Sequence, residues 1–181
     1  MKSYLTARVA AASMTLALCA ALSASASAQG TPASATLFTA ELGGYSEVPA
    51  VSSPGSGFFV ARIRPGDAGI DYTLGYSGLQ GAVTQAHIHF GQPNVAGGIS
   101  VWLCGAQTQQ GVGPTSCPQS GAITGAIVAG NVVGPTNQLI GPGELNEIIA
   151  AMRAGLAYAN VHSDQVPSGE IRGQIRGLQG F

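Results

Sequence analysis

The sequence predicts an all-β protein, an antiparallel Greek-key-like β-sandwich or barrel with one short covering helix. Many short runs alternate between apolar and polar residues, as strands with one buried face do. The chain contains 27 glycines and 10 prolines, and turn-forming clusters of them separate these runs. Only residues 145–152 repeat apolar side chains at a clear helical spacing.

The alternating runs succeed one another in an order typical of hairpins. In one run, Phe59, Ala61 and Ile63 share a face, and the turn at residues 65–67 leads into the next run. This pair is expected to form a hairpin. The expected strands, of which the sixth is the weakest, span residues 36–42, 57–64, 70–76, 84–90, 99–103, 121–129, 156–162 and 170–176.

One amphipathic helix interrupts the strands. Leu145, Ile148, Ile149 and Met152 follow the i, i+3, i+4, i+7 pattern and form one apolar stripe. Gly155 is well placed to end the helix. We expect the helix to cover one end of the sandwich, and packing on the core is a sufficient role for it.

The N-terminus has the form of an export signal. A positively charged start precedes an apolar run at residues 9–22, which is too short to span a bilayer, and small residues follow at 26–28. We therefore expect a signal peptide over residues 1–28 and one mature domain over residues 29–181. The mature protein is expected in the periplasm or outside the cell.

The cysteines suit an exported protein. Cys19 would permit a lipid anchor, but the bulky Leu18 before it argues against lipoprotein processing. The remaining pair, Cys104 and Cys117, is expected to form a disulfide because the compartment is oxidising. The competing interpretation, two thiolate metal ligands, fits no zinc spacing.

Charge argues against a nucleic acid partner, and hydropathy argues against a membrane-spanning helix in the mature chain. The formal net charge is −1 at pH 7 and the few basic residues are scattered, which argues against nucleic acid binding. After the N-terminal segment no stretch is long and apolar enough to be a membrane helix. A protein partner in the periplasm or outside the cell stays open.

All three histidines lie in two alternating segments. His87 and His89 are two residues apart in an expected strand, so they share a face with Cβ atoms about 6.6 Å apart. His162 lies in another expected strand and could complete a three-nitrogen site for copper or zinc. The alternative is that the rings only form hydrogen bonds within the fold.

Three charged residues are candidates to support that site. Glu47 or Glu170 could supply a fourth ligand or accept a hydrogen bond from an imidazole. Glu170 and Arg172 are expected on one face of a strand, where they could pair or Arg172 could bind an anion. Trp102 lies among apolar neighbours and is expected in the core.

Three separated motifs resemble those of the CHRD domain family, named for the animal protein chordin. They are Glu47-Val48-Pro49, the segment Ala86-His87-Ile88-His89-Phe90-Gly91, and residues 160–163 leading to 167–175. The resemblance extends from about residue 37 to 175 and implies an extracytoplasmic, mostly antiparallel β domain.

A weaker similarity links the chain to the copper-zinc superoxide dismutases. His87, His89, His162 and Arg172 match residue types of that family, but its fourth copper histidine and zinc aspartate have no counterpart here. The sequence favours a non-enzymatic binding or structural module that binds a transition metal. The alternatives are a copper-dependent oxidoreductase and an adhesion or matrix module with structural histidines.

Overall fold

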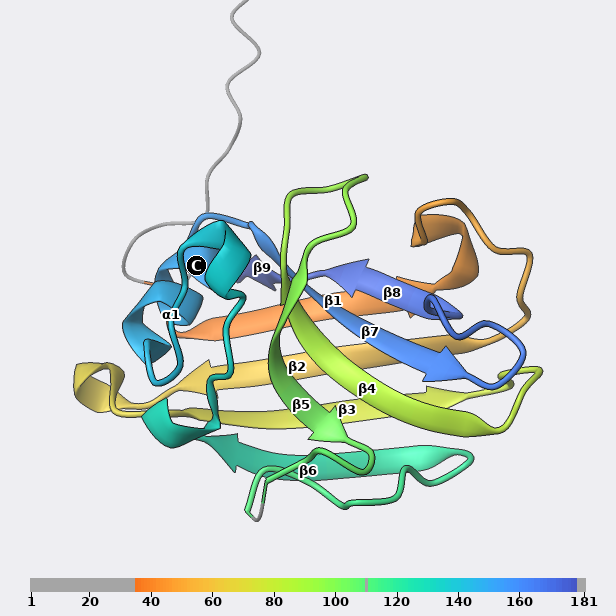
Figure 1. Ribbon diagram of the computed structural model, residues 1–181, viewed down its shortest axis with the longest axis horizontal. Coiled ribbons are helices and arrows are strands. Elements are labelled where there is room, and N and C mark those ends of the chain that lie inside the picture. Colours follow the sequence, from red (N-terminus) through yellow and green to blue (C-terminus); the bar gives the residue numbers. More distant parts are fainter. Residues whose placement is uncertain (1–34, 110, 179–181) are drawn as a thin grey trace, which may run out of the picture.

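The computed structural model describes residues 35–109 and 111–178, which form one antiparallel sheet and a single α-helix (Figure 1). The expected signal peptide lies outside the described residues. Within the described ranges no helix could cross a membrane. The elements are β1 (Leu37–Gly43), β2 (Ser56–Ile63), β3 (Ile70–Ser77), β4 (Val83–Phe90), β5 (Gly98–Cys104), β6 (Gly121–Ile127), α1 (Leu145–Arg153), β7 (Ala157–Ser163), β8 (Ile171–Gln174) and β9 (Arg176–Gly177).

The strands are ordered β5-β4-β7-β8-β1-β2-β3-β6, and β9 pairs with β1. The sheet curls into a nearly closed barrel, so β5, β4 and β7 cross over β1, β2 and β3 (Figure 1). The predicted hairpin is β2–β3, whereas β4 pairs with β7, more than 60 residues later along the chain. The predicted fold class is confirmed.

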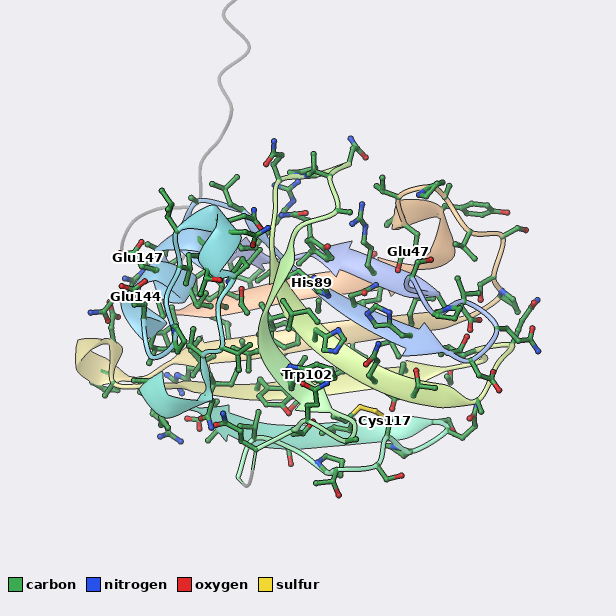
Figure 2. The ribbon with its side chains drawn as sticks, in the orientation of Figure 1. Glu47, His89, Trp102, Cys117, Glu144 and Glu147 are labelled. Carbon is green, nitrogen blue, oxygen red and sulfur yellow. A yellow bond between two sulfur atoms is a disulfide. The ribbon has the colours of Figure 1, made fainter. Side chains whose placement is uncertain are left out.

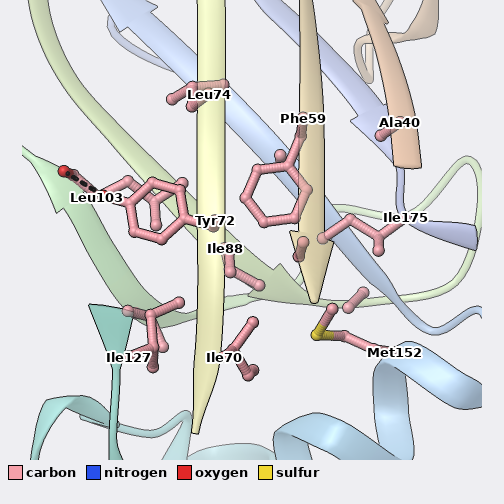
Figure 3. Packing of buried hydrophobic residues seen from close by; sticks show 14 of the residues in the cluster. Ala40, Phe59, Ile70, Tyr72, Leu74, Ile88, Leu103, Ile127, Met152 and Ile175 are labelled. Atoms are coloured by element: carbon pink, nitrogen blue, oxygen red, sulfur yellow. Dashed lines mark hydrogen bonds between the residues drawn. The ribbon is translucent and has the colours of Figure 1, made fainter. Parts of the chain in front are cut away.

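The inward faces of the strands enclose an apolar core. Phe59 stacks on Tyr72 with ring centroids 5.9 Å apart, and Ile88 of β4 is fully buried (Figure 3). Met152 closes one end of this core from α1, which ends before Gly155 at a φ of +70°. The predicted covering helix is therefore present.

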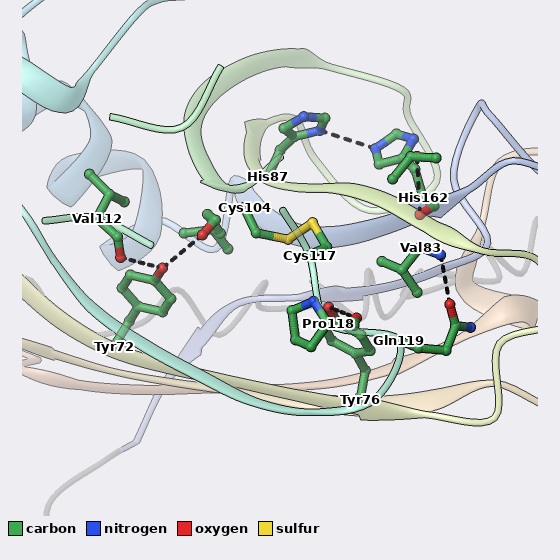
Figure 4. Close-up of a disulfide and its surroundings, with 12 residues drawn as sticks. Tyr72, Tyr76, Val83, His87, Cys104, Val112, Cys117, Pro118, Gln119 and His162 are labelled. Atoms are coloured by element: carbon green, nitrogen blue, oxygen red, sulfur yellow. Dashed lines mark hydrogen bonds between the residues drawn. A yellow bond between two sulfur atoms is a disulfide. The ribbon is translucent and has the colours of Figure 1, made fainter. Parts of the chain in front are cut away.

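Two contacts link β5 to the opposite side of the barrel across the seam between β5 and β6. The Tyr72 hydroxyl of β3 lies 3.1 Å from the carbonyl oxygen of Leu103 in β5 and 2.7 Å from that of Val112. A disulfide joins Cys104 to Cys117, with Cα atoms 5.2 Å apart (Figure 4). The predicted disulfide is confirmed, and it ties the end of β5 to the loop that leads into β6.

Strand β7 is buried on both faces along its whole length. Ala159 and Val161 point into the core, as the alternation predicts, while Tyr158, Asn160 and His162 take the opposite face. An outward face of a barrel is normally wet, so loops must cover it here. The candidate site lies between this face and its covering loops.

Candidate metal centre

The sheet brings the three histidines together. Strands β4 and β7 are antiparallel neighbours, and their register places His87 opposite Asn160, His89 opposite Tyr158 and Gln85 opposite His162. Side chains that are opposite each other or on the diagonal share one face of a strand pair. All three rings therefore lie on the outward face of β4 and β7, where Figure 2 labels His89.

The ring nitrogens converge at the spacing of metal ligands. His87 Nδ1 lies 3.1 Å from His162 Nε2 (Figure 4), and each of the three histidines offers a nitrogen within 4.8 Å of the others. An ion with bonds of about 2.0 Å to three imidazoles separates their nitrogens by about 3.3–3.5 Å. The separations in the cluster lie on both sides of that range, so the three histidines could hold a metal ion.

Backbone carbonyls orient two of the rings. His89 Nδ1 lies 3.0 Å from the Gly97 oxygen, and His162 Nδ1 lies 2.9 Å from the Pro167 oxygen. A carbonyl only accepts, so each Nδ1 carries the proton and each Nε2 keeps its lone pair, which in His162 accepts a hydrogen bond from His87 Nδ1. Metal-binding histidines are held in their tautomer by such bonds.

Burial gives the rings further features of ligands. Among the described residues, His87 Nε2 and His89 Nε2 are buried atoms without a hydrogen-bond partner. Burial lowers the pKa of His87 to about 2 and that of His89 to about 4, and it also lowers the pKa of His162. The rings are therefore neutral at neutral pH, which is the state that binds metals.

Two aromatic side chains form walls of the cluster. The Trp102 ring, labelled with His89 in Figure 2, meets His87 edge-to-face at a centroid distance of 4.2 Å, and Tyr158 stacks on His89 at 4.7 Å. The placement of Trp102 in the core is wrong, because Trp102 pairs with His87 across β4 and β5 and takes the outward face. Tyr158 was not among the site residues predicted from the sequence, although its spacing of four residues from His162 places both on one strand face.

Arg172 connects the site to its covering loops. Its guanidinium donates to the carbonyl oxygens of Ser46 and Val95, lies 4.6 Å from the Tyr158 ring centre, and pairs with Glu47 at 3.7 Å. Among the described residues, Arg172 Nη2 is buried without a hydrogen-bond partner. Arg172 thus holds two loops against the sheet beside the histidines.

The two candidate glutamates lie in different surroundings. Glu47 accepts a hydrogen bond from Asn160, and burial raises its pKa to about 7 although the Arg172 guanidinium opposes this. Glu170 accepts from the Ser53 hydroxyl at 2.6 Å and the Gln80 amide at 2.7 Å. Arg172 thus pairs with Glu47 rather than Glu170, and backbone oxygens occupy the places where a carboxylate was expected to orient a ring.

The histidine cluster lies within a recognised sequence family. The model of the CHRD domain family matches residues 38–175, a range that includes strands β2 to β8 and all of β1 except Leu37, whereas β9 follows it. The chain belongs to the CHRD domain family. No curated protein and no solved structure matches the chain. The predicted family is confirmed, and in this CHRD domain the three histidines, Glu47 and Arg172 all fall inside the matched range.

Proposed function

We propose that this CHRD protein is an exported metal-binding module that holds one transition-metal ion, copper or zinc, on His87, His89 and His162. The observation that carries the proposal is the convergence of three buried ring nitrogens from adjoining strands. The carbonyls of Gly97 and Pro167 support it, because they leave lone pairs on the nitrogens that converge.

Binding rather than catalysis fits the burial of the site. The three histidines are 0–7% exposed, and both unpartnered ring nitrogens are buried. A substrate would have to displace the covering loops to reach a bound ion. The proposal therefore assigns the ion to a binding or structural role.

Export forms part of the proposal and is supported by the disulfide between Cys104 and Cys117, a bond typical of oxidising compartments. Removal of residues 1–28 is expected on export. Intact-mass measurement on protein recovered from the periplasm or the medium should then give a chain that begins at Gln29. A full-length chain that stays in the cytosol would contradict this part of the proposal.

Metal analysis tests the proposed site directly. Purified protein is expected to bind one equivalent of copper or zinc, and His89→Ala is expected to lose it because two imidazoles remain. Trp102 is the only tryptophan and contacts His87, so its fluorescence should report binding in a titration. A folded protein that binds neither metal at neutral pH would leave the histidines with a structural role only.

The loop that orients His89 offers a second prediction. A Cβ on Gly97 would overlap the Phe90 carbonyl oxygen, so Gly97→Ala must displace the carbonyl that holds His89. Loss of such an orienting contact lowers metal affinity by about 10–100-fold. Gly130→Ala is the matched control, because a Cβ there meets no atom within 4 Å. Equal affinities of the two variants in calorimetric titrations would contradict the role of Gly97.

A further inference from the structure

We infer that the ion these histidines hold is monovalent copper, Cu(I), in a three-coordinate site built only of neutral ligands. The inference rests on the proposed function and narrows it to one ion and one oxidation state. It follows from three observations: the charge of the ligand set, the nature of its walls, and the engagement of the nearby acids.

The ligand set carries no charge. Among the described residues, the cluster consists of His87, His89 and His162 without a carboxylate or thiolate. A divalent ion would therefore bring two uncompensated positive charges into the protein, and Cu(I) would bring one. The energy of a buried charge rises with its square, so the desolvation penalty is about four times larger for the divalent ion.

The aromatic side chains around the site do not compensate the extra positive charge of a divalent ion. Trp102 and Tyr158 present aromatic surface to His87 and His89 at centroid distances of 4.2 and 4.7 Å. Aromatic rings attract cations but are much weaker partners than carboxylates. Such an environment suits a soft ion of low charge with few ligands.

The neighbouring acids are engaged elsewhere. Glu47 pairs with Arg172 and accepts from Asn160, while Glu170 accepts from Ser53 and the Gln80 amide through Oε1 and is not part of the histidine cluster. The Arg172 guanidinium acts in the opposite sense, since it lies 4.6 Å from the centre of the Tyr158 ring that stacks on His89 and brings a positive charge beside the site. The local field therefore disfavours a second positive charge on the ion.

Competition experiments on the mature protein test the inference. Cu(I) is supplied under anaerobic, reducing conditions in competition with a cuprous chelator, and Zn(II) in competition with a zinc indicator. We expect Cu(I) to bind at least about 100-fold more tightly than Zn(II). X-ray absorption of the copper-loaded protein should show three nitrogen neighbours at about 2.0 Å.

A pair of variants isolates the effect of charge. His162→Asp adds a carboxylate to the ligand set, whereas His162→Asn is similar in size and neutral. We expect His162→Asp to shift the preference between the two ions toward Zn(II) by about 10-fold or more relative to His162→Asn. Equal shifts in the two variants would overturn the charge argument.

The outcomes separate this inference from the proposed function. Tight, three-coordinate Cu(I) with weak Zn(II) supports both. Zn(II) binding as tight as Cu(I), or a four-coordinate copper site, overturns the inference and leaves the metal-binding module intact. Failure of the wild-type protein to bind either ion overturns the proposed function itself.

Discussion

Arg172→Ala is expected to lower the free energy of unfolding by about 3–5 kcal/mol, the cost of breaking a buried ion pair from one side. Arg172 and Glu47 are 6% and 5% exposed in their side chains, so Glu47 would lose its nearby opposite charge. The carbonyl oxygens of Ser46 and Val95 would lose their charged donor as well. Equilibrium denaturation in urea measures the loss.

The exposed pair Arg64–Asp71 provides the matched control. Their side chains are 39% and 53% exposed, so Arg64→Ala is expected to change the stability by about 0–1 kcal/mol. Adding Glu47→Gln to Arg172→Ala should restore part of the loss, because the substitution removes the unpaired buried carboxyl. An Arg172→Ala variant as stable as Arg64→Ala would contradict the stabilising role of the buried pair.

The effect of Arg172→Ala is expected to depend on pH. Burial already raises the pKa of Glu47 to about 7 in the wild type, and loss of the opposing Arg172 charge must raise the pKa further. When folding raises the pKa of a carboxyl, the free energy of unfolding falls as the pH rises between the pKa in the unfolded chain and the pKa in the folded protein. The stability deficit of Arg172→Ala should therefore be larger at pH 8 than at pH 6.

Removal of the Cys104–Cys117 disulfide is expected to cost about 3 kcal/mol, because the bond restricts a loop of the unfolded chain. The bridged residues are 13 apart in sequence. Alanine replaces both cysteines in the double variant Cys104→Ala/Cys117→Ala. Serine is avoided because position 104 is fully buried and a serine hydroxyl there would be buried too. Denaturation of wild type and variant, each with and without reductant, measures the effect.

Reductant should lower the stability of the wild type toward that of the double variant and leave the variant unchanged. Because the disulfide lies at the seam between β5 and β6, hydrogen exchange should rise first in the loop that contains Val112. An unfolding midpoint that does not respond to reduction would show that noncovalent contacts hold the seam.

Local sequence patterns predicted most strands and the helix, because the periodicity that marks each of these elements is set by residues close together in the chain. The strand expected at residues 170–176 is divided at Ile175, whose amide donates to the Ala157 carbonyl, because the chain pairs with both β7 and β1 before this point and with β1 after it. This change of pairing partner depends on strands that are distant in the sequence. The periodicity within residues 170–176 therefore cannot predict it.

The candidate site was predictable only in part. The face shared by His87 and His89 follows from strand geometry, but their meeting with His162 depends on the pairing of β4 with β7. The roles of Gly97 and Pro167 rest on carbonyl oxygens, which every residue possesses, so no side-chain pattern marks them. Trp102 was assigned inward because its strand is apolar throughout, and only its register against His87 places the ring outward.

The loops over β4 and β7 have a kinetic consequence. Segments around Ser46, Val95 and Pro167 are fastened over the histidines by Arg172 and by His162, so an ion can exchange only while one of these segments is open. The residence time of the ion would then follow the frequency of loop opening more than the strength of its bonds. If the proposed ion is bound there, dilution alone should release it slowly, and any contact that opens a covering loop should release it faster.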